Sequence, residues 1–468
     1  MLKKVIEQLD NSQFELLHQE LAENRGEKFV RLLELYRETG KNDPDIRDEV
    51  GANQAAFYTL KSRLQDKVQQ FLFRTATDNR AELLKNISSI PHLVYNSPRE
   101  TAISMLEHLE TELKRLDMPS ELVSVYNGLK KLHLNSAQYY HYQQLYNKNV
   151  AYALALDKAD ELASVFTREL CDFLLSRDNA KREILKLYLR EMANLSRLYD
   201  SHRLKVTRII MAASFGIFAS EENEIPETEE TIEDMLRQFH TIVDEHPEDR
   251  HYRFLRYVWH FLNYEYYKKL GLQKNGNLSF EKVNASLNSF LLLHHSCPAA
   301  WFLLSRSERP TEKAVEELRF LPDPEDAFSF TCFHLALAAG LFQDQKFSEA
   351  ATTLNKVVNE ISFKNYPFAE CQVKLFLGLC YLLAEKSEQA EVAVRSISRK
   401  LSGDLADQFP AAQAFSRFLK TAVNDASPKK LQKLEQALAI FRQANTGPEA
   451  VLKFVKITDV HLQALAKI

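Results

Sequence analysis

Two segments within residues 328–400 repeat one arrangement of small and large residues, and this repeat constrains the fold more than any other feature of the sequence. The second copy has the spacing L-G-x-x-Y…A, formed by Leu377, Gly378, Tyr381 and Ala390. The first copy has matching residues at Leu337, Ala338, Leu341, Phe347 and Ala350. A small residue on each of two helices lets their backbones approach closely, and large residues fill the groove between them. The repeat therefore predicts two consecutive helical hairpins.

This repeat resembles the tetratricopeptide repeat (TPR), a helix–turn–helix unit of about 34 residues. The step from Ala350 to Ala390 is longer than that, so we expect TPR-like units with extended helices. One such hairpin cannot bury its apolar face alone, and about three or more units are expected to stack. The chain as a whole is similar to uncharacterised bacterial TPR-like proteins with an N-terminal helical block. The resemblance implies an α-solenoid with a role in protein interaction.

The scarcity of glycine supports an all-α fold. Only 11 of 468 residues are glycine, whereas the average glycine content of proteins is about 7%. Tight β-hairpin turns, bulges and phosphate-binding loops depend on glycine, so the composition disfavours them. The predicted fold is therefore an all-α α-solenoid of stacked TPR-like helical hairpins. It has an N-terminal helical cap that contains a helix-turn-helix-like segment.

Shifts in composition and residues that interrupt the helical pattern divide the chain into four predicted parts. Residues 1–80 form an N-terminal helical block, 81–220 a region of helical hairpins, 221–235 an acidic linker, and 236–468 the TPR-like region. The linker contains the run EENEIPETEETIED, which favours a solvated loop and leaves a docking site for a basic partner as the alternative. The longest helices expected before the linker lie near residues 121–134, 137–156, 159–175, 180–199 and 203–218. Helix starts are predicted at Pro98, where Ser97 and Glu100 would form a capping box, and at Pro428 and Pro448.

The N-terminal block contains a helix-turn-helix-like segment at residues 45–68. A short helix, a turn at Gly51 and a long helix from Asn53 give this arrangement. Its predicted packing face consists of Ile46, Val50, Phe57, Leu60 and Leu64. The segment resembles the DNA-reading part of sigma-factor or repressor domains, which implies nucleic-acid contacts at Lys61, Arg63 and Lys67. The neighbouring acidic residues favour a plain helical packing unit instead.

Two regions supply candidate partner-binding residues. Residues 251–270 form a strongly aromatic helix, for which core packing is the favoured interpretation. An exposed binding face with Arg253, Arg256 and Tyr257 is the alternative. In the repeat region, helical phase makes His334 and Lys374 the candidate groove contacts.

The sequence gives no reason to propose catalysis. It has no H-E-x-x-H, G-x-x-x-x-G-K-[ST], G-x-G-x-x-G or G-x-S-x-G motif and no C-x-x-C pair. The closest metal-like cluster is His294, His295 and Cys297, where adjacent histidines point about 100° apart and favour a solvated helix end. We therefore expect no catalytic residues, no bound metal and no cofactor.

The remaining features indicate a cytoplasmic location. The five cysteines are sparse, odd in number and set in apolar stretches, which is typical of reduced buried thiols. The N-terminus lacks the apolar core of a signal peptide, and the longest apolar run, 209–219, is about half the length of a membrane span, so no transmembrane segment is expected. A net charge of −4 gives no general attraction to nucleic acid.

Together these features predict a non-catalytic scaffold or adaptor that binds a protein or peptide partner on a helical-repeat surface. A nucleic-acid-binding regulator is the main alternative. It would use residues 45–68 or the basic C-terminal end, which carries Lys420, Lys429, Lys430, Lys433, Lys453 and Lys456. A third alternative is an enzyme with no recognisable motif.

Overall fold

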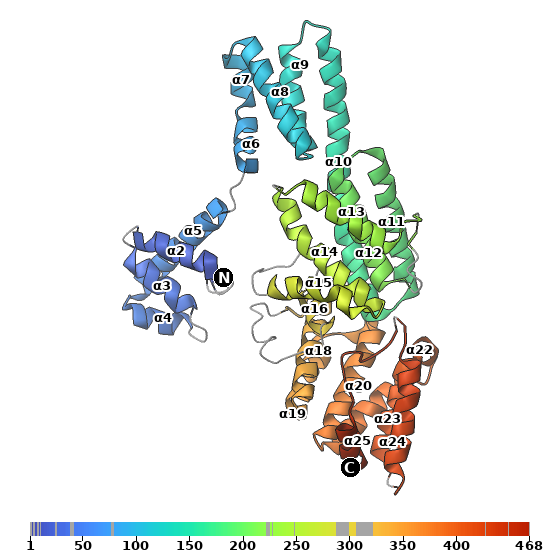
Figure 1. Ribbon diagram of the computed structural model, residues 1–468. Helices are drawn as coiled ribbons and strands as arrows, with labels where there is room; N and C mark the ends of the chain where they lie inside the picture. The colour runs from blue at the N-terminus through green and yellow to red at the C-terminus, as the bar shows by residue number, and fades with distance from the viewer. Residues whose placement is uncertain are drawn as a thin grey trace. The chain divides into compact units, whose positions relative to one another are not determined.

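The structure is a computed structural model of the 468-residue chain. It describes all residues except 1, 3–4, 7–8, 10, 24–25, 38–41, 76–78, 221–224, 227, 248, 287–298, 306–321, 426, 448 and 468. The described residues form 23 α-helices and no strand, which confirms the all-α prediction (Figure 1). Their contacts divide them into two compact units, unit 1 up to Lys158 and unit 2 from Ala159. The predicted boundaries near residues 80, 220 and 235 stay predictions.

Unit 1 begins with a bundle that contains the predicted helix-turn-helix-like segment. The bundle comprises α2 (Asn11–Glu23), α3 (Glu27–Arg37), α4 (Asp43–Val50) and α5 (Gln54–Thr75). Gly51 ends α4 in the left-handed region with a φ of 66°, which glycine adopts without strain. The predicted packing face is confirmed, because Ile46, Phe57 and Leu64 are buried in the core while Val50 and Leu60 pack against it.

The rest of unit 1 is a second helical bundle. It contains α6 (Asn79–Ser88), α7 (Ile90–Asn96), α8 (Arg99–Arg115), α9 (Pro119–Leu132) and the first part of α10 (Gln138–Ser176). Tyr126 is fully buried in its core and donates a hydrogen bond of 2.9 Å to Glu110. The two helices predicted at 137–156 and 159–175 are one 39-residue helix, α10. The polar residues between them, Asp157 and Lys158, include no helix breaker, so the helix continues.

Unit 2 continues with helices that pack as sequential neighbours. They are α11 (Asn179–Leu198), α12 (His202–Phe218), α13 (Ile232–Glu245), α14 (Arg250–Lys269), α15 (Gln273–Ser286) and α16 (Ala299–Ser305). The apolar run at 209–219 lies in the last part of α12 and at its C-cap, and all of its residues except Phe218 are buried. Among the helices of the described residues, none combines the length and apolar character that a membrane span requires.

The C-terminal part of unit 2 contains the repeated segments. Its helices are α18 (Ala327–Gln343), α19 (Phe347–Glu360), α20 (Pro367–Leu383), α21 (Ser387–Lys400), α22 (Asp404–Gln408), α23 (Pro410–Asn424), α24 (Lys430–Ala444) and α25 (Asp459–Lys467), with a short 3-10 turn η1 (Phe363–Asn365). α18 packs on α19 and α20 on α21, as the repeat predicted (Figure 1). The turns of both pairs contain a residue with positive φ, Gln345 at 61° and Glu385 at 58°. These two residues are separated by the same step as Ala350 and Ala390, so the two turns are structurally equivalent.

The predicted helix starts at proline are wrong where the structure describes them. Pro98 occupies the N-cap of α8 and, having no side-chain acceptor, makes no cap bond, while Glu100 pairs with Arg99 at 2.7 Å. Helix α24 begins at Lys430, two residues after Pro428. Pro448 lies outside the described residues, but 449–458 after it are not helical.

Candidate partner-binding site

The last part of the chain crosses the first helices of the repeated pairs. Residues 449–467, here called the C-terminal segment, comprise an irregular stretch at 449–458 followed by α25. The segment contacts α20, and side-chain contacts occur at both ends of the segment. Leu452 lies beside Gln372 of α20, and His461 packs on Phe342 and Phe347 at the turn between α18 and α19, with ring centroids 4.9 and 5.9 Å apart.

Side chains bind several backbone groups of the irregular stretch at 449–458. The Asn445 amide donates to the Val451 carbonyl at 2.9 Å and accepts from the Val451 N–H at 2.8 Å. The Leu452 N–H donates to Gln372 Oε1 at 3.3 Å, and Arg442 Nη2 donates to the Ile457 carbonyl at 3.1 Å. A pair of bonds to one residue's N–H and C=O reproduces what a neighbouring strand would supply. Because these bonds involve only the backbone of the segment, they do not depend on its side-chain sequence.

Apolar side chains fix the position of the segment along α20. Val451 is fully buried, Leu452 is 3% exposed and Phe454 is 6% exposed. The Phe454 ring lies 5.8 Å from the ring of Phe376 on α20. Burial of each such side chain stabilises the docked state by about 1.5–3 kcal/mol. Backbone bonds and apolar contacts together give this surface the properties of a site for an extended peptide.

The two predicted groove residues lie on the first helices of the two repeated pairs. His334 on α18 is 8% exposed, and its Nδ1 is 2.9 Å from the Phe330 carbonyl. Burial lowers the pKa of its imidazole. Lys374 on α20 pairs with the buried Glu370 at 2.6 Å and also contacts Ser396. Both side chains are thus engaged within unit 2, and their role in partner binding stays a prediction.

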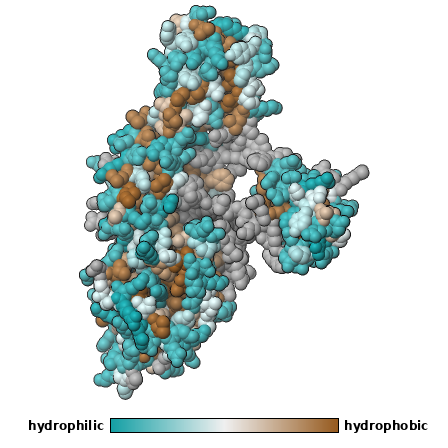
Figure 2. All heavy atoms as spheres, turned by 180° about the vertical axis from the view of Figure 1, so that it is seen from behind, coloured by the Kyte–Doolittle hydropathy of each residue, from teal (hydrophilic) through white to brown (hydrophobic). Residues whose placement is uncertain are grey.

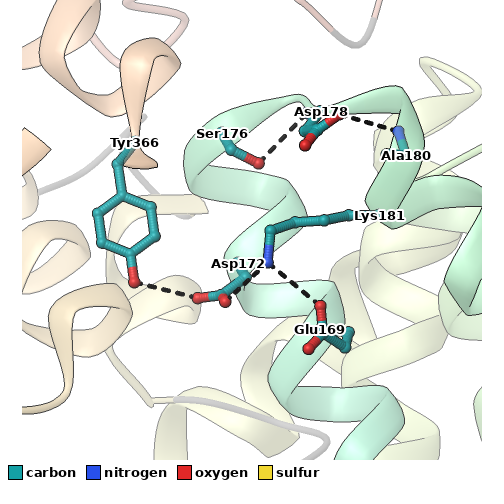
Figure 3. A network of polar contacts seen from close by, with 7 residues as sticks. All are labelled: Glu169, Asp172, Ser176, Asp178, Ala180, Lys181 and Tyr366. Atoms are coloured by element: carbon teal, nitrogen blue, oxygen red, sulfur yellow. Dashed lines mark hydrogen bonds and ion pairs between the residues drawn. The ribbon is translucent and has the colours of Figure 1, made fainter. Parts of the chain in front are cut away.

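A polar network fixes the N-terminal end of α20 to α10 and α11, as Figure 3 shows. Lys181 of α11 bridges two carboxylates of α10, Glu169 at 3.2 Å and Asp172 at 2.9 Å. The Tyr366 hydroxyl, just before α20, donates to the other oxygen of Asp172 at 3.3 Å. Burial raises the pKa of Tyr366, and the Asp172 charge raises it further, so the phenol remains a donor at neutral pH. The sequence carries no signal of this network, because Tyr366 lies 194 residues from Asp172 in the chain.

The aromatic helix α14 contributes mainly to the core. Tyr252, Val258, Phe261 and Leu262 are buried, and Trp259 donates to the Leu236 carbonyl of α13 at 2.7 Å. Of the three predicted binding residues, Arg256 is exposed and pairs with Asp244 at 3.4 Å, and Tyr257 is half-buried. The side chain of Arg253 lies outside the described residues. Partner binding by these three residues stays a prediction.

His260 on α14 gives a pH dependence that can be measured. Burial, together with the positive charges of Lys282, His240 and Arg256, lowers the pKa of His260 from 6.5 to about 4. Between these values the unfolded chain binds a proton that the folded chain does not, so stability falls as the pH falls. We expect His260→Gln to reduce the loss of unfolding free energy between pH 7 and pH 4.5 by about 1–2 kcal/mol, a value discounted for the partial exposure of the ring. Urea unfolding at both pH values measures this difference, and equal losses in variant and wild type would contradict it.

The predicted nucleic-acid contacts differ in how they are engaged. Lys61 pairs with Asp43 at 2.5 Å, and Asp43 also accepts from the Tyr36 hydroxyl at 3.0 Å. Lys67 lies over the Phe29 ring at 5.4 Å, whereas Arg63 is exposed. Burial raises the pKa of Asp43, but the bonds from Lys61 and Tyr36 outweigh this and lower it. Asp43 thus neutralises the charge of Lys61, while nucleic-acid contact by the three residues stays a prediction.

Several groups that could take part in chemistry are buried, and others lie outside the described residues. A cavity of about 30 Å³ in unit 2, lined by Thr167, Cys171, Ser214, Trp301 and apolar side chains, has room for one or two water molecules but not for a substrate. Burial raises the pKa of the Cys371 thiol to about 12, which suppresses its reactivity. Among the described residues, no group of three or more His, Cys, Asp or Glu could hold a metal ion. His294, His295 and Cys297 lie outside those residues.

Exposed apolar residues alone do not locate a binding face. Figure 2 shows hydrophobic residues in several groups, with hydrophilic residues between them, on the face in view. Large apolar side chains with more than half of their surface exposed include Leu187, Leu198, Ile440 and Val460. The surface of α20 that contacts the C-terminal segment differs from these groups, because Gln372 accepts a hydrogen bond from the backbone of the segment. No protein family, curated protein or solved structure was found to match the chain.

Proposed function

We propose that the chain is a non-catalytic cytoplasmic scaffold or adaptor, an α-solenoid of TPR-like hairpins that binds an extended segment of a protein partner. The observation that carries this proposal is the seating of the C-terminal segment on α20. The side chains of Asn445, Gln372 and Arg442 form hydrogen bonds with the backbone of its irregular stretch. The Phe454 ring packs on the Phe376 ring. Repeat proteins bind partners along the first helices of their units by many such contacts.

The C-terminal segment acts in this proposal as an internal occupant of the partner site. A partner segment with apolar residues spaced like Val451, Leu452 and Phe454 would make the same contacts, because the backbone bonds accept any sequence. The tethered segment competes at an effective concentration in the millimolar range, which sets the affinity that a partner needs. Weakening the segment should therefore open the site.

Phe454→Ala is expected to increase the affinity of the full chain for a peptide of residues 449–460 added in trans. Loss of the buried ring weakens docking of the tethered segment by about 3 kcal/mol, which corresponds to about a 100-fold gain in apparent affinity for the competing peptide. Fluorescence anisotropy of the labelled peptide measures this gain.

Two further variants make this result specific. Val460→Ala removes a side chain that is 64% exposed in the same segment and should leave peptide affinity unchanged. Gln372→Ala added to Phe454→Ala should weaken peptide binding again, because the bond from Leu452 is lost. A Phe454→Ala chain that is folded by circular dichroism but binds no peptide would contradict the proposal, since the segment would then be a fixed part of the fold.

A nucleic-acid-binding regulator is the second candidate, favoured by the arrangement of α4, Gly51 and α5 with Arg63 exposed. Under this alternative, duplex DNA should bind with strong salt dependence, and Arg63→Glu with Lys67→Glu should weaken binding at least about tenfold. The scaffold proposal expects weak binding that these substitutions do not change. Anisotropy of a labelled duplex at two salt concentrations separates the two.

A further inference from the structure

Four cationic side chains of unit 2 lie close together where the C-terminal segment begins. Two of them meet at the last turn of α12. Arg177, in the turn between α10 and α11, donates through Nη1 to the Phe218 carbonyl at 3.4 Å. Lys269, at the end of α14, donates to the Gly216 and Ser220 carbonyls, each at 2.8 Å. The neighbouring Lys268 donates to the Ser305 carbonyl and hydroxyl.

The fourth cation, Lys453, comes from the C-terminal segment. The Arg177 guanidinium lies 5.0 Å from the centre of the Phe368 ring, and Leu452 donates to Gln372. Phe368 and Gln372 are one turn apart on the same face of α20. This brings Lys453, next to Leu452, within about a helical turn of Arg177. Its Nζ donates to the Gly447 carbonyl at 2.7 Å.

The electrostatics agree with this crowding. Partial burial of the ammonium group and the positive charges of Arg177 and Lys268 lower the pKa of Lys453. Partial burial and the charge of Lys453 lower the pKa of Lys269 to about 8. Burial lowers the pKa of Arg177, and the negative charge of Glu449 partly opposes this by raising it. Glu265 lies near Lys268, and burial raises the pKa of Glu265 and disfavours its charged form.

Arg177 also has unused hydrogen-bonding capacity. It is 9% exposed, and its Nε–H has no hydrogen-bond partner among the described residues. A buried donor without an acceptor is unfavourable, and the mutual repulsion of the cations adds to this. Lys269 and Lys453 are exposed, so an anion from solvent can reach the cluster. Such an anion would reduce the mutual repulsion of the cations.

We propose that Arg177, Lys269 and Lys453 form a binding site for a phosphate group, either inorganic phosphate or a phosphate monoester. A dianion neutralises more of four positive charges than a single carboxylate can. Guanidinium and ammonium groups together bind phosphate through charge-assisted hydrogen bonds. The site requires the docked C-terminal segment, because Lys453 belongs to that segment, whereas the proposed peptide binding displaces it.

Isothermal titration of the full chain with sodium phosphate at constant ionic strength tests this site. Saturable binding is expected in the wild type, and acetate, as a monoanion, should bind at least about tenfold more weakly. Phenyl phosphate in a parallel titration identifies the source. Tighter binding than inorganic phosphate points to a phosphorylated ligand, and weaker binding points to free phosphate.

Lys453→Gln and Lys269→Gln should each weaken phosphate binding at least about tenfold. Lys456→Gln is the matched control, because Lys456 is an exposed lysine of the same segment and should leave binding unchanged. Absence of saturable phosphate binding in the wild type would overturn the proposal. Equal weakening by Lys456→Gln would also overturn it, because general charge attraction would then explain the binding.

Discussion

Replacement of Phe376 by alanine is expected to lower the free energy of unfolding of unit 2 by about 3–5 kcal/mol. Phe376 is fully buried at the middle of α20. Its ring lies 5.5 Å from the Phe342 ring of α18 and 5.8 Å from the Phe454 ring of the C-terminal segment. Alanine would leave a cavity where three parts of the chain meet, and rigid helices on two sides limit how far the site can collapse.

Tryptophan fluorescence during urea unfolding measures this loss. Both tryptophans of the chain, Trp259 and Trp301, belong to unit 2, so the signal reports on that unit. The midpoint should fall with little change in the urea dependence, because the unfolded chain exposes a similar surface. Val392→Ala on α21 is the control. Its side chain is 68% exposed, so the expected change is within about 0.5 kcal/mol. A Phe376→Ala loss below about 1.5 kcal/mol would contradict this packing.

Local patterns allowed much of the helical fold to be predicted. The packing face of the helix-turn-helix-like segment followed from the spacing of Ile46, Phe57 and Leu64, because helical neighbours recur every three or four residues. The two repeated helix pairs could be predicted because small residues occupy equivalent positions in both segments. Helix boundaries were less predictable. The polar pair Asp157 and Lys158 indicated a break that α10 does not have, because exposed polar residues are compatible with a continuous helix.

Features of the candidate site that depend on distant contacts had no signal in the sequence. Asp172 and Tyr366 meet across 194 residues, and neither belongs to a recognisable motif. The C-terminal segment was predicted to be helical from Pro448, but Val451, Leu452 and Ile457 form backbone hydrogen bonds with the side chains of Asn445, Gln372 and Arg442. Tertiary contacts thus replaced the local bonds of a helix. The burial of His334 likewise depends on neighbours that helical phase does not reveal.

Gly378→Leu is expected to lower the free energy of unfolding of unit 2 by about 3 kcal/mol, near the upper end of the usual cost of overpacking. A Cβ atom at Gly378 would lie 3.1 Å from Val394 Cγ2 of α21 and 3.4 Å from Leu419 Cδ1 of α23. The Cβ alone therefore fills the available space. The remaining atoms of leucine must push α21 or α23 away from α20, and the helix-forming advantage of leucine, about 1 kcal/mol over glycine, offsets only part of that cost.

The size of the substituent separates packing from helix propensity. Gly378→Ala should change stability by less than about 1 kcal/mol, because its tight contact with Val394 opposes the gain in helix propensity. Ala338→Leu, at the equivalent and fully buried place on α18, should cost about as much as Gly378→Leu if the two pairs are structural repeats. Urea unfolding followed by tryptophan fluorescence compares all three variants. If both leucine variants were as stable as wild type, close helix approach at these small residues would not be what holds the pairs together. If only Ala338→Leu were tolerated, the equivalence of the two pairs would be limited to their sequence.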